Sequence, residues 1–219
     1  MGATRITRDA VSIGVATGIY AVSFGVLSVA AGFSVAQTCV MSLVAFTGAS
    51  QFTFVSVLGA GGGVAAGLPP ALLLAGRNAI YALSLREVLR GGRLRRAVSA
   101  HFVIDESTAM AHAQDEPADK RRAFVATGAA IFVCWNLGTL AGALAGGALT
   151  DPRSLGLDAI FPAVFLALLV PQLATGRRAV GAAVLGAAIA LVLLPLAPAG
   201  VPVMASVLGC VPFLRRREP

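Results

Sequence analysis

One arginine, Arg77, stands inside an apolar segment. Residues 10–76 contain no Asp, Glu, Lys or Arg, and the apolar residues 72–74 and 79–80 flank Arg77. A guanidinium group in such surroundings can hold a carboxylate or pair with an acidic residue that changes its protonation. Arg77 and the adjoining Asn78 are therefore candidate substrate-binding residues. The alternative is that the long Arg77 side chain only extends toward the membrane surface.

Two adjacent carboxylates, Asp105 and Glu106, form a second candidate group. Neighbouring residues on a helix point about 100° apart, so the two cannot face one site equally. One of them can pair with Arg77 while the other carries a proton, because a carboxyl group removed from water holds its proton more readily. The alternative is an interfacial helix on which both acids are solvated.

His101 is a third candidate for proton coupling. If residues 98–112 form one helix, His101, Asp105, Thr108 and His112 share a polar face. Two histidines on such a helix are too few for a metal site, and the three cysteines are far apart without a CxxC motif. We therefore expect no metal and no cofactor.

Small and polar residues interrupt an apolar stretch at residues 47–51, Thr-Gly-Ala-Ser-Gln. Gly48 and Ala49 let a backbone approach a ligand closely, while Ser50 and Gln51 offer hydrogen-bond donors and acceptors. A turn unwound here would free carbonyl and N–H groups to bind a zwitterion. The alternative is close helix packing through Gly48 and Ala49, with Gln51 bonded across helices.

Trp135 precedes three glycines spaced four residues apart, Gly138, Gly142 and Gly146. This GxxxG spacing is typical of helices that pack closely, within one chain, against a partner or in a homo-oligomer. Trp135 is a candidate substrate-binding residue or an anchor at the membrane interface. The chain contains no Ser-His-Asp order, HExxH, P-loop or Rossmann signature, so we expect neither an enzyme nor an ATP-driven pump.

These candidates lie in a chain of 219 residues that is 57% hydrophobic and 12% charged, with a mean hydropathy of +0.84. That composition predicts a single all-α transmembrane domain over residues 1–219. Basic residues stand at the ends of apolar runs, so the net charge of +7 indicates a basic face beside the bilayer and not a nucleic-acid partner.

The apolar stretches predict about six to eight membrane helices, of which one or two are broken or re-entrant. The stretches cover residues 10–37, 38–60, 64–85, 98–112, 123–150, 159–175, 179–197 and 200–214.

Clusters of basic residues indicate the orientation, because cytoplasmic loops carry an excess of Lys and Arg. The clusters lie at residues 5–8, 86–96, 120–122, 177–178 and 215–217. If all are cytoplasmic, the three apolar stretches before residue 86 must make an even number of crossings. We therefore expect residues 38–60 to be broken or re-entrant, residues 98–112 to dip into the membrane or lie on it, residues 177–178 to mark a turn, and the N-terminus to be cytoplasmic. The alternative is three full crossings with the N-terminus outside.

Several of these motifs resemble, in order, those of the AzlC family, the large subunits of bacterial branched-chain amino acid exporters. Residues 42–52, Ser-Leu-Val-Ala-Phe-Thr-Gly-Ala-Ser-Gln-Phe, are similar to the family's S-L-x-x-F-x-G-A-S-Q-F stretch. The segment around Arg77, the Asp105-Glu106 pair and the helix of Trp135 resemble further family motifs. The chain departs from the pattern where Asn78 replaces a His and Ile104 replaces a Thr.

The resemblance implies export of Leu, Ile, Val or Met across the bacterial inner membrane by proton antiport. It also implies a small AzlD-type membrane subunit as partner. A second hypothesis, from the glycine-rich faces, is a non-catalytic assembly subunit whose partner forms the transport path.

Overall fold

The structure is a computed structural model that describes residues 2–148, 166, 169–170, 172–198 and 200–213. The described residues form helices and no strands, which confirms the all-α prediction for this part of the chain. Most of the predicted span 159–175 and the whole basic cluster 215–217 lie outside the described residues.

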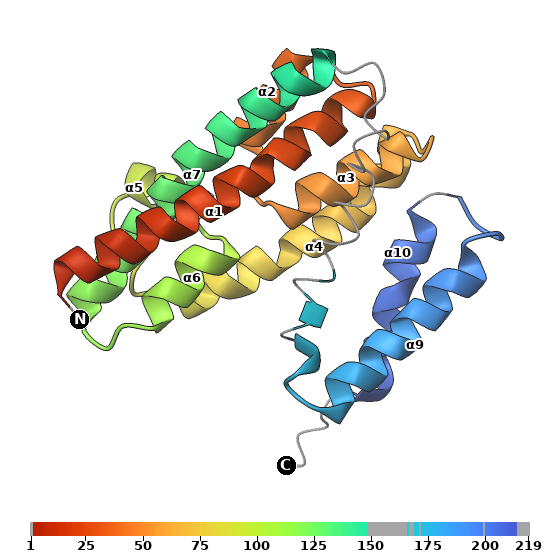
Figure 1. The fold of residues 1–219 in the computed structure, drawn as a ribbon. Helices are drawn as coiled ribbons and strands as arrows, with labels where there is room; N and C mark the ends of the chain where they lie inside the picture. Colours follow the sequence, from red (N-terminus) through yellow and green to blue (C-terminus); the bar gives the residue numbers. More distant parts are fainter. Residues whose placement is uncertain (1, 149–165, 167–168, 171, 199, 214–219) are drawn as a thin grey trace.

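The helices of the described residues follow the order shown in Figure 1. They are α1 (Ala3–Ala30), α2 (Val35–Val44), α3 (Ala49–Gly59), α4 (Val64–Ser84), α5 (Arg93–His101), α6 (Asp105–His112), α7 (Pro117–Ala148), α9 (Arg177–Leu193), α10 (Val201–Ser206) and the 3-10 helix η2 (Val207–Phe213). Among them, α1 and α7 are long and apolar enough to cross a bilayer.

Helices α1 and α7 run parallel and form the spine of the molecule (Figure 1). Their backbones approach closely because glycines lie between them. A Cβ atom added to Gly138 would collide with the carbonyl oxygen of Gly18, and one added to Gly142 would collide with that of Val22. The GxxxG face of α7 therefore packs within the chain, one of the two packing arrangements that the sequence predicts.

The apolar stretch 38–60 is interrupted between α2 and α3, as its sequence predicts. Gly48, just before α3, has a φ of 60°, which lies in the region that favours glycine. The chain returns at the end of α3 to the end of α1, because a Cβ on Gly59 would lie 3.4 Å from the Cβ of Ala31. Helices α2 and α3 thus form a hairpin whose two ends lie at the same end of the spine (Figure 1).

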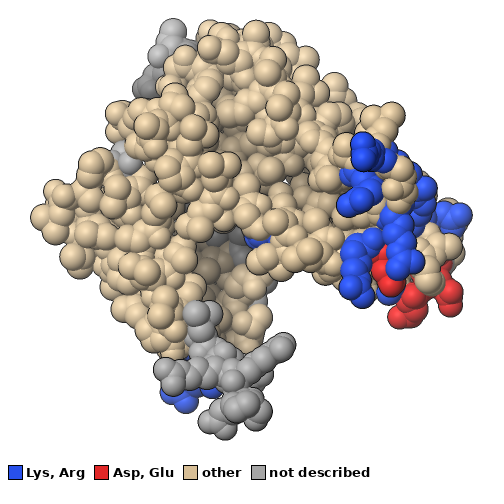
Figure 2. All heavy atoms as spheres, turned by 180° about the vertical axis from the view of Figure 1, so that it is seen from behind, with Lys and Arg blue, Asp and Glu red and all other residues tan. Residues whose placement is uncertain are grey.

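Helix α4 runs back to the end of the spine where α7 begins. Leu85, directly after α4, is buried together with Val103, Ala111 and Phe124, which belong to the α5–α6 segment and to the first turns of α7. Most of the Lys and Arg side chains visible in Figure 2 gather at this end of the molecule. The basic clusters before residue 123 therefore share one end, as expected of residues on one side of a membrane.

The expectation of one polar face over residues 98–112 is wrong, because this segment forms two helices, α5 and α6. Ser107 causes the interruption. Its hydroxyl accepts from the Ile104 N–H group and donates to the Phe102 carbonyl, so backbone groups between the helices bond to a side chain. The four polar residues of the expected face are consequently divided between two helix axes.

The C-terminal helices also differ from expectation. Arg177 and Arg178 do not form the turn but begin α9, and the turn precedes them at Gly176, which has a φ of 140°. Within the short stretch 200–214, the residues Val201–Phe213 are helical, and α10 passes directly into the tighter η2, which contains Pro212. Proline lacks the N–H group that a continuous α-helix requires, which explains the change of geometry.

The α1–α7 contact predicts how two glycines of α7 respond to the same substitution. Gly142→Ala should lower the free energy of unfolding by about 1–3 kcal/mol, because the added methyl group overlaps the α1 backbone. Gly147→Ala is the matched control, since open space surrounds Gly147, and it should be neutral or stabilising by up to about 1 kcal/mol. Denaturation of the detergent-solubilised protein measures both. Equal effects of the two substitutions would contradict this account of the spine.

Candidate functional site

A small cavity lies where the α2–α3 interruption meets the start of α6. It brings together six of the residues that the sequence singles out, contributed by four separate parts of the chain: Gly48, Ala49, Arg77, Asp105, Glu106 and Trp135. Its volume is about 60 Å³, enough for a few water molecules. Charged and apolar groups thus surround one partly open space inside an otherwise apolar bundle.

Arg77 and Asp105 form an ion pair across this cavity, joining α4 to α6. The distance from Nη2 of Arg77 to Oδ2 of Asp105 is 2.7 Å, and the two side chains are 28% and 35% exposed. The Tyr81 side chain, one turn further along α4, also hydrogen-bonds Asp105. Arg77 therefore pairs with an acidic residue, one of the arrangements that the sequence suggests, and its role in substrate binding stays a prediction.

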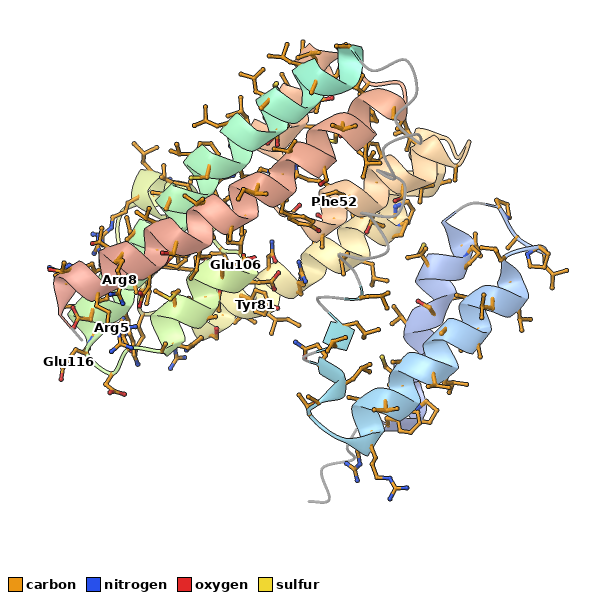
Figure 3. All side chains as sticks on the ribbon, viewed as in Figure 1. Arg5, Arg8, Phe52, Tyr81, Glu106 and Glu116 are labelled. Carbon is orange, nitrogen blue, oxygen red and sulfur yellow. The ribbon has the colours of Figure 1, made fainter. Side chains whose placement is uncertain are left out.

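Glu106 lies beside this ion pair but does not join it. Among the described residues, no ion pair includes the Glu106 carboxylate, although Glu106 lines the same cavity as Arg77. Figure 3 shows Glu106 and Tyr81 in the region where α6 faces α4. The site therefore holds one compensated carboxylate and one that can take a proton or a cationic group.

The N-termini of two helices meet at the cavity. Helix α3 begins at Ala49 and α6 begins at Asp105, and both residues line the cavity. The first N–H groups of a helix lack partners within it, and the helix dipole places partial positive charge there. The start of α3 therefore adds partial positive charge beside the guanidinium of Arg77, whereas the first turn of α6 already carries the carboxylates of Asp105 and Glu106.

Trp135 closes one side of the cavity. Its side chain is only 4% exposed, and its indole N–H group donates to no described residue. Aromatic rings of Tyr20 and Phe24 pack against the indole, with centroid distances of 5.7 Å and 6.1 Å. A buried donor without a partner is costly, so this N–H group is available to a ligand in the cavity.

Ser50 and Gln51, two further candidates, line a different and mainly apolar hollow between α3 and α4. The Gln51 side chain accepts from the Gly48 N–H at 3.2 Å and donates to the Met41 carbonyl at 3.1 Å. Ser50 forms a short hydrogen bond with the Thr47 hydroxyl. The Gln51 bonds satisfy backbone groups at the interruption, whereas the Ser50 bond joins two side chains, and neither residue lines the cavity.

Asn78 and His101 also lie away from the lining of the cavity. The Oδ1 atom of Asn78 is buried without a hydrogen bond to any described residue. His101 packs against the rings of Phe46 and Phe132, with centroid distances of 5.7 Å and 5.5 Å. His101 therefore stands behind Phe46, which itself lines the cavity.

Sequence reasoning missed Thr17 and Tyr20, which line the cavity from α1, and Ile131 from α7. Thr17 and Tyr20 could have been noticed as polar side chains within an uncharged run. Such residues are common in membrane helices, so this feature alone does not identify a site. Ile131 carries no signal, because an apolar residue in an apolar span indicates nothing about its neighbours.

The fold and the site together define a polytopic all-α membrane protein with a charged cavity at two helix interruptions. The chain belongs to the AzlC family, whose model, described as AzlC protein, matches residues 12–149. This result confirms the resemblance found in the motifs. No solved structure matches the chain.

Two relatives are both described as uncharacterized membrane proteins. The one from Archaeoglobus fulgidus is 34% identical over 174 residues, which cover 78% of this chain and 75% of the relative. The one from Helicobacter pylori is 27% identical over 152 residues, which cover 68% of this chain and 66% of the relative. Both descriptions agree with the membrane location that the helices indicate.

A double-mutant cycle on Arg77→Gln and Asp105→Asn should give a coupling free energy of about 1–3 kcal/mol. Removing one partner leaves the charge of the other in a poorly solvated place. Because both side chains are partly exposed, the coupling free energy stays below that of a fully buried ion pair. The control is the exposed pair Arg90–Glu87, separated by 3.8 Å with side chains 78% and 71% exposed, which should couple by less than about 1 kcal/mol. Denaturation of each variant in detergent supplies the free energies. Similar coupling free energies in both pairs would show that the cavity does not strengthen the Arg77–Asp105 ion pair.

Proposed function

We propose that this chain is the large subunit of a secondary transporter that exports branched-chain and other small apolar amino acids by proton antiport. The observation that carries the proposal is the Arg77–Asp105 ion pair in a cavity that also holds the unpaired Glu106. Ionisable groups inside a membrane bundle are costly, and they typically mark substrate or proton pathways. Membership of the AzlC family supports the same class of function.

The residues around the cavity offer a partner for each part of an amino acid, and we propose that the cavity, about 60 Å³ in this structure, widens when the substrate enters. The substrate carboxylate can be held by Arg77, by the N–H groups at the start of α3 and by the indole N–H group of Trp135. The Glu106 carboxylate can hold the ammonium group. Apolar lining from Ile104 and Ile131 suits an aliphatic side chain.

Competition for Glu106 gives a simple account of antiport. The carboxylate can bind either a proton or the substrate's ammonium group, but not both at once. The protein therefore carries a proton in one direction and the amino acid in the other. Arg77 keeps a carboxylate partner in both states: Asp105 alone in the proton-loaded state, and Asp105 together with the substrate carboxylate in the substrate-loaded state.

The arrangement in a membrane follows from the two interrupted segments. We propose that α2–α3 enters from the outer side and α5–α6 from the cytoplasmic side, so that their interruptions meet at the cavity. The N-terminus is then cytoplasmic, as the basic start of α1 favours, and the membrane is the bacterial inner membrane. The partner in this proposal is a small AzlD-type membrane subunit.

Counterflow of labelled leucine in proteoliposomes tests the proposal, with the chain reconstituted with and without the small subunit. Arg77→Ala and Asp105→Asn should each reduce uptake at least about tenfold, since each removes a charge-assisted contact worth about 1.5–3 kcal/mol. Glu106→Gln should abolish the acceleration of transport by a pH gradient, because an amide cannot exchange a proton. The control is Arg121→Ala, an exposed position at the start of α7, which should transport normally.

Two outcomes would contradict the proposal. If the proteoliposomes take up no aliphatic amino acid, even with the small subunit present, the protein is not an exporter of this class. Normal uptake by the Arg77 and Asp105 variants would instead indicate that this chain is an assembly subunit and that its partner forms the path.

A further inference from the structure

A second hollow lies at the end of α4, apart from the cavity described above. It opens between the last turns of α4 and the whole length of α5, with a volume of about 770 Å³, within the ~300–1,000 Å³ range of small-molecule sites. The apolar part of its lining comprises Ala82, Leu83, Leu89, Ala97 and Ala100. The hollow is thus large enough for a ligand and mainly apolar at its base.

Four arginines stand around this apolar base: Arg86, Arg90, Arg93 and Arg96. Arg90 lies 3.8 Å from Glu87, whereas no ion pair joins Arg86, Arg93 or Arg96 to any described residue. Two arginines follow α4 and two belong to α5, so separate elements bring the charges together. This concentration of unpaired positive charge would attract a compact anion.

Helix α5 adds a second, independent indication of an anion. Its first turn contains no acidic residue, no side chain caps its N-terminus, and Arg93, Arg95 and Arg96 all lie near that end. Positive side chains beside the positive end of a helix dipole are unfavourable, and an anion there would reverse the effect. In addition, α5 buries none of its residues against the protein.

The hollow continues the exposed apolar face of α4. Leu72, Ile80 and Leu83 are all more than 60% exposed, and their spacing places them on one face of the helix. Leu83 also lines the hollow, together with Arg86 and Arg90, which follow α4 in the chain. An apolar chain lying along α4 would therefore end among the arginines.

We propose that this hollow is a binding site for an anionic phospholipid. The arginines hold the phosphate head group, and an acyl chain lies on the apolar base and along α4. A basic pocket at the cytoplasmic end of membrane helices has the chemistry that such head groups need. A free phosphate ion would use the arginines alone and would leave the apolar base in contact with water, so the lipid fits the whole hollow better.

Native mass spectrometry of the detergent-purified protein, loaded with phosphatidylglycerol or with phosphatidylcholine, tests this proposal. The wild type should retain phosphatidylglycerol preferentially. Arg86→Gln/Arg93→Gln should weaken its binding about 25-fold, at about fivefold for each arginine near a membrane surface. The control, Arg5→Gln/Arg8→Gln, removes the same charge at the same end of the molecule but outside the hollow, and should retain the lipid.

A charge-conserving variant separates lipid binding from folding. Arg86→Lys/Arg93→Lys should keep most of the preference for phosphatidylglycerol, because lysine still supplies the charge. The proposal would be overturned if the wild type retained phosphatidylglycerol and phosphatidylcholine equally. It would also be overturned if Arg86→Gln/Arg93→Gln and its control Arg5→Gln/Arg8→Gln lost phosphatidylglycerol to the same extent. Displacement of the lipid by glycerophosphate at millimolar concentration would assign the site to a free phosphate. If Arg86→Gln/Arg93→Gln no longer binds the small subunit but still binds the lipid as the wild type does, the hollow is a site for a protein partner.

Discussion

A charge inside a membrane bundle needs a partner, and in this protein that requirement is met by the ion pair of Arg77 and Asp105. The pair joins the start of α6 to α4, beside the α5–α6 interruption that the Ser107 side chain stabilises. Glu106 follows Asp105 directly, so the same contact brings an unpaired carboxylate to the cavity. The proposed exchange of a proton for an amino acid depends on this placement, because both ligands must reach Glu106 while Arg77 remains compensated.

The spine of α1 and α7 supplies the rigid surface against which both interruptions are held. Glycines allow the two helices to approach closely, while the interruptions on either side satisfy their backbone groups through side chains. The Gln51 side chain bonds to backbone groups of the α2–α3 hairpin, and the Ser107 side chain bonds to backbone groups of the α5–α6 segment. A rigid spine with two locally stabilised interruptions can hold polar groups at a defined place without exposing unpaired backbone to lipid.

The sequence predicts the parts of this arrangement that charge and composition control. An uncharged run that ends at one arginine indicates a membrane protein, the basic clusters favour a segment that does not cross, and the small polar residues at 47–51 locate the interruption. It does not predict the second interruption, because one serine side chain decides it through local bonds. It also cannot tell that Gln51 bonds to the backbone while Tyr20 lines the cavity, since orientation within a bundle is set by tertiary packing.

The central claim, that an amino acid binds in the cavity beside Arg77, can be tested most directly through Trp135. Trp135 is the one tryptophan of the sequence and lines the cavity, so its fluorescence reports on that space alone. We would titrate the purified protein with leucine and follow this emission. The account predicts a saturable change in the wild type that is lost in Arg77→Ala and kept in Arg121→Ala. A saturable change that persists unaltered in Arg77→Ala, or no response of the wild type to any aliphatic amino acid, would contradict it.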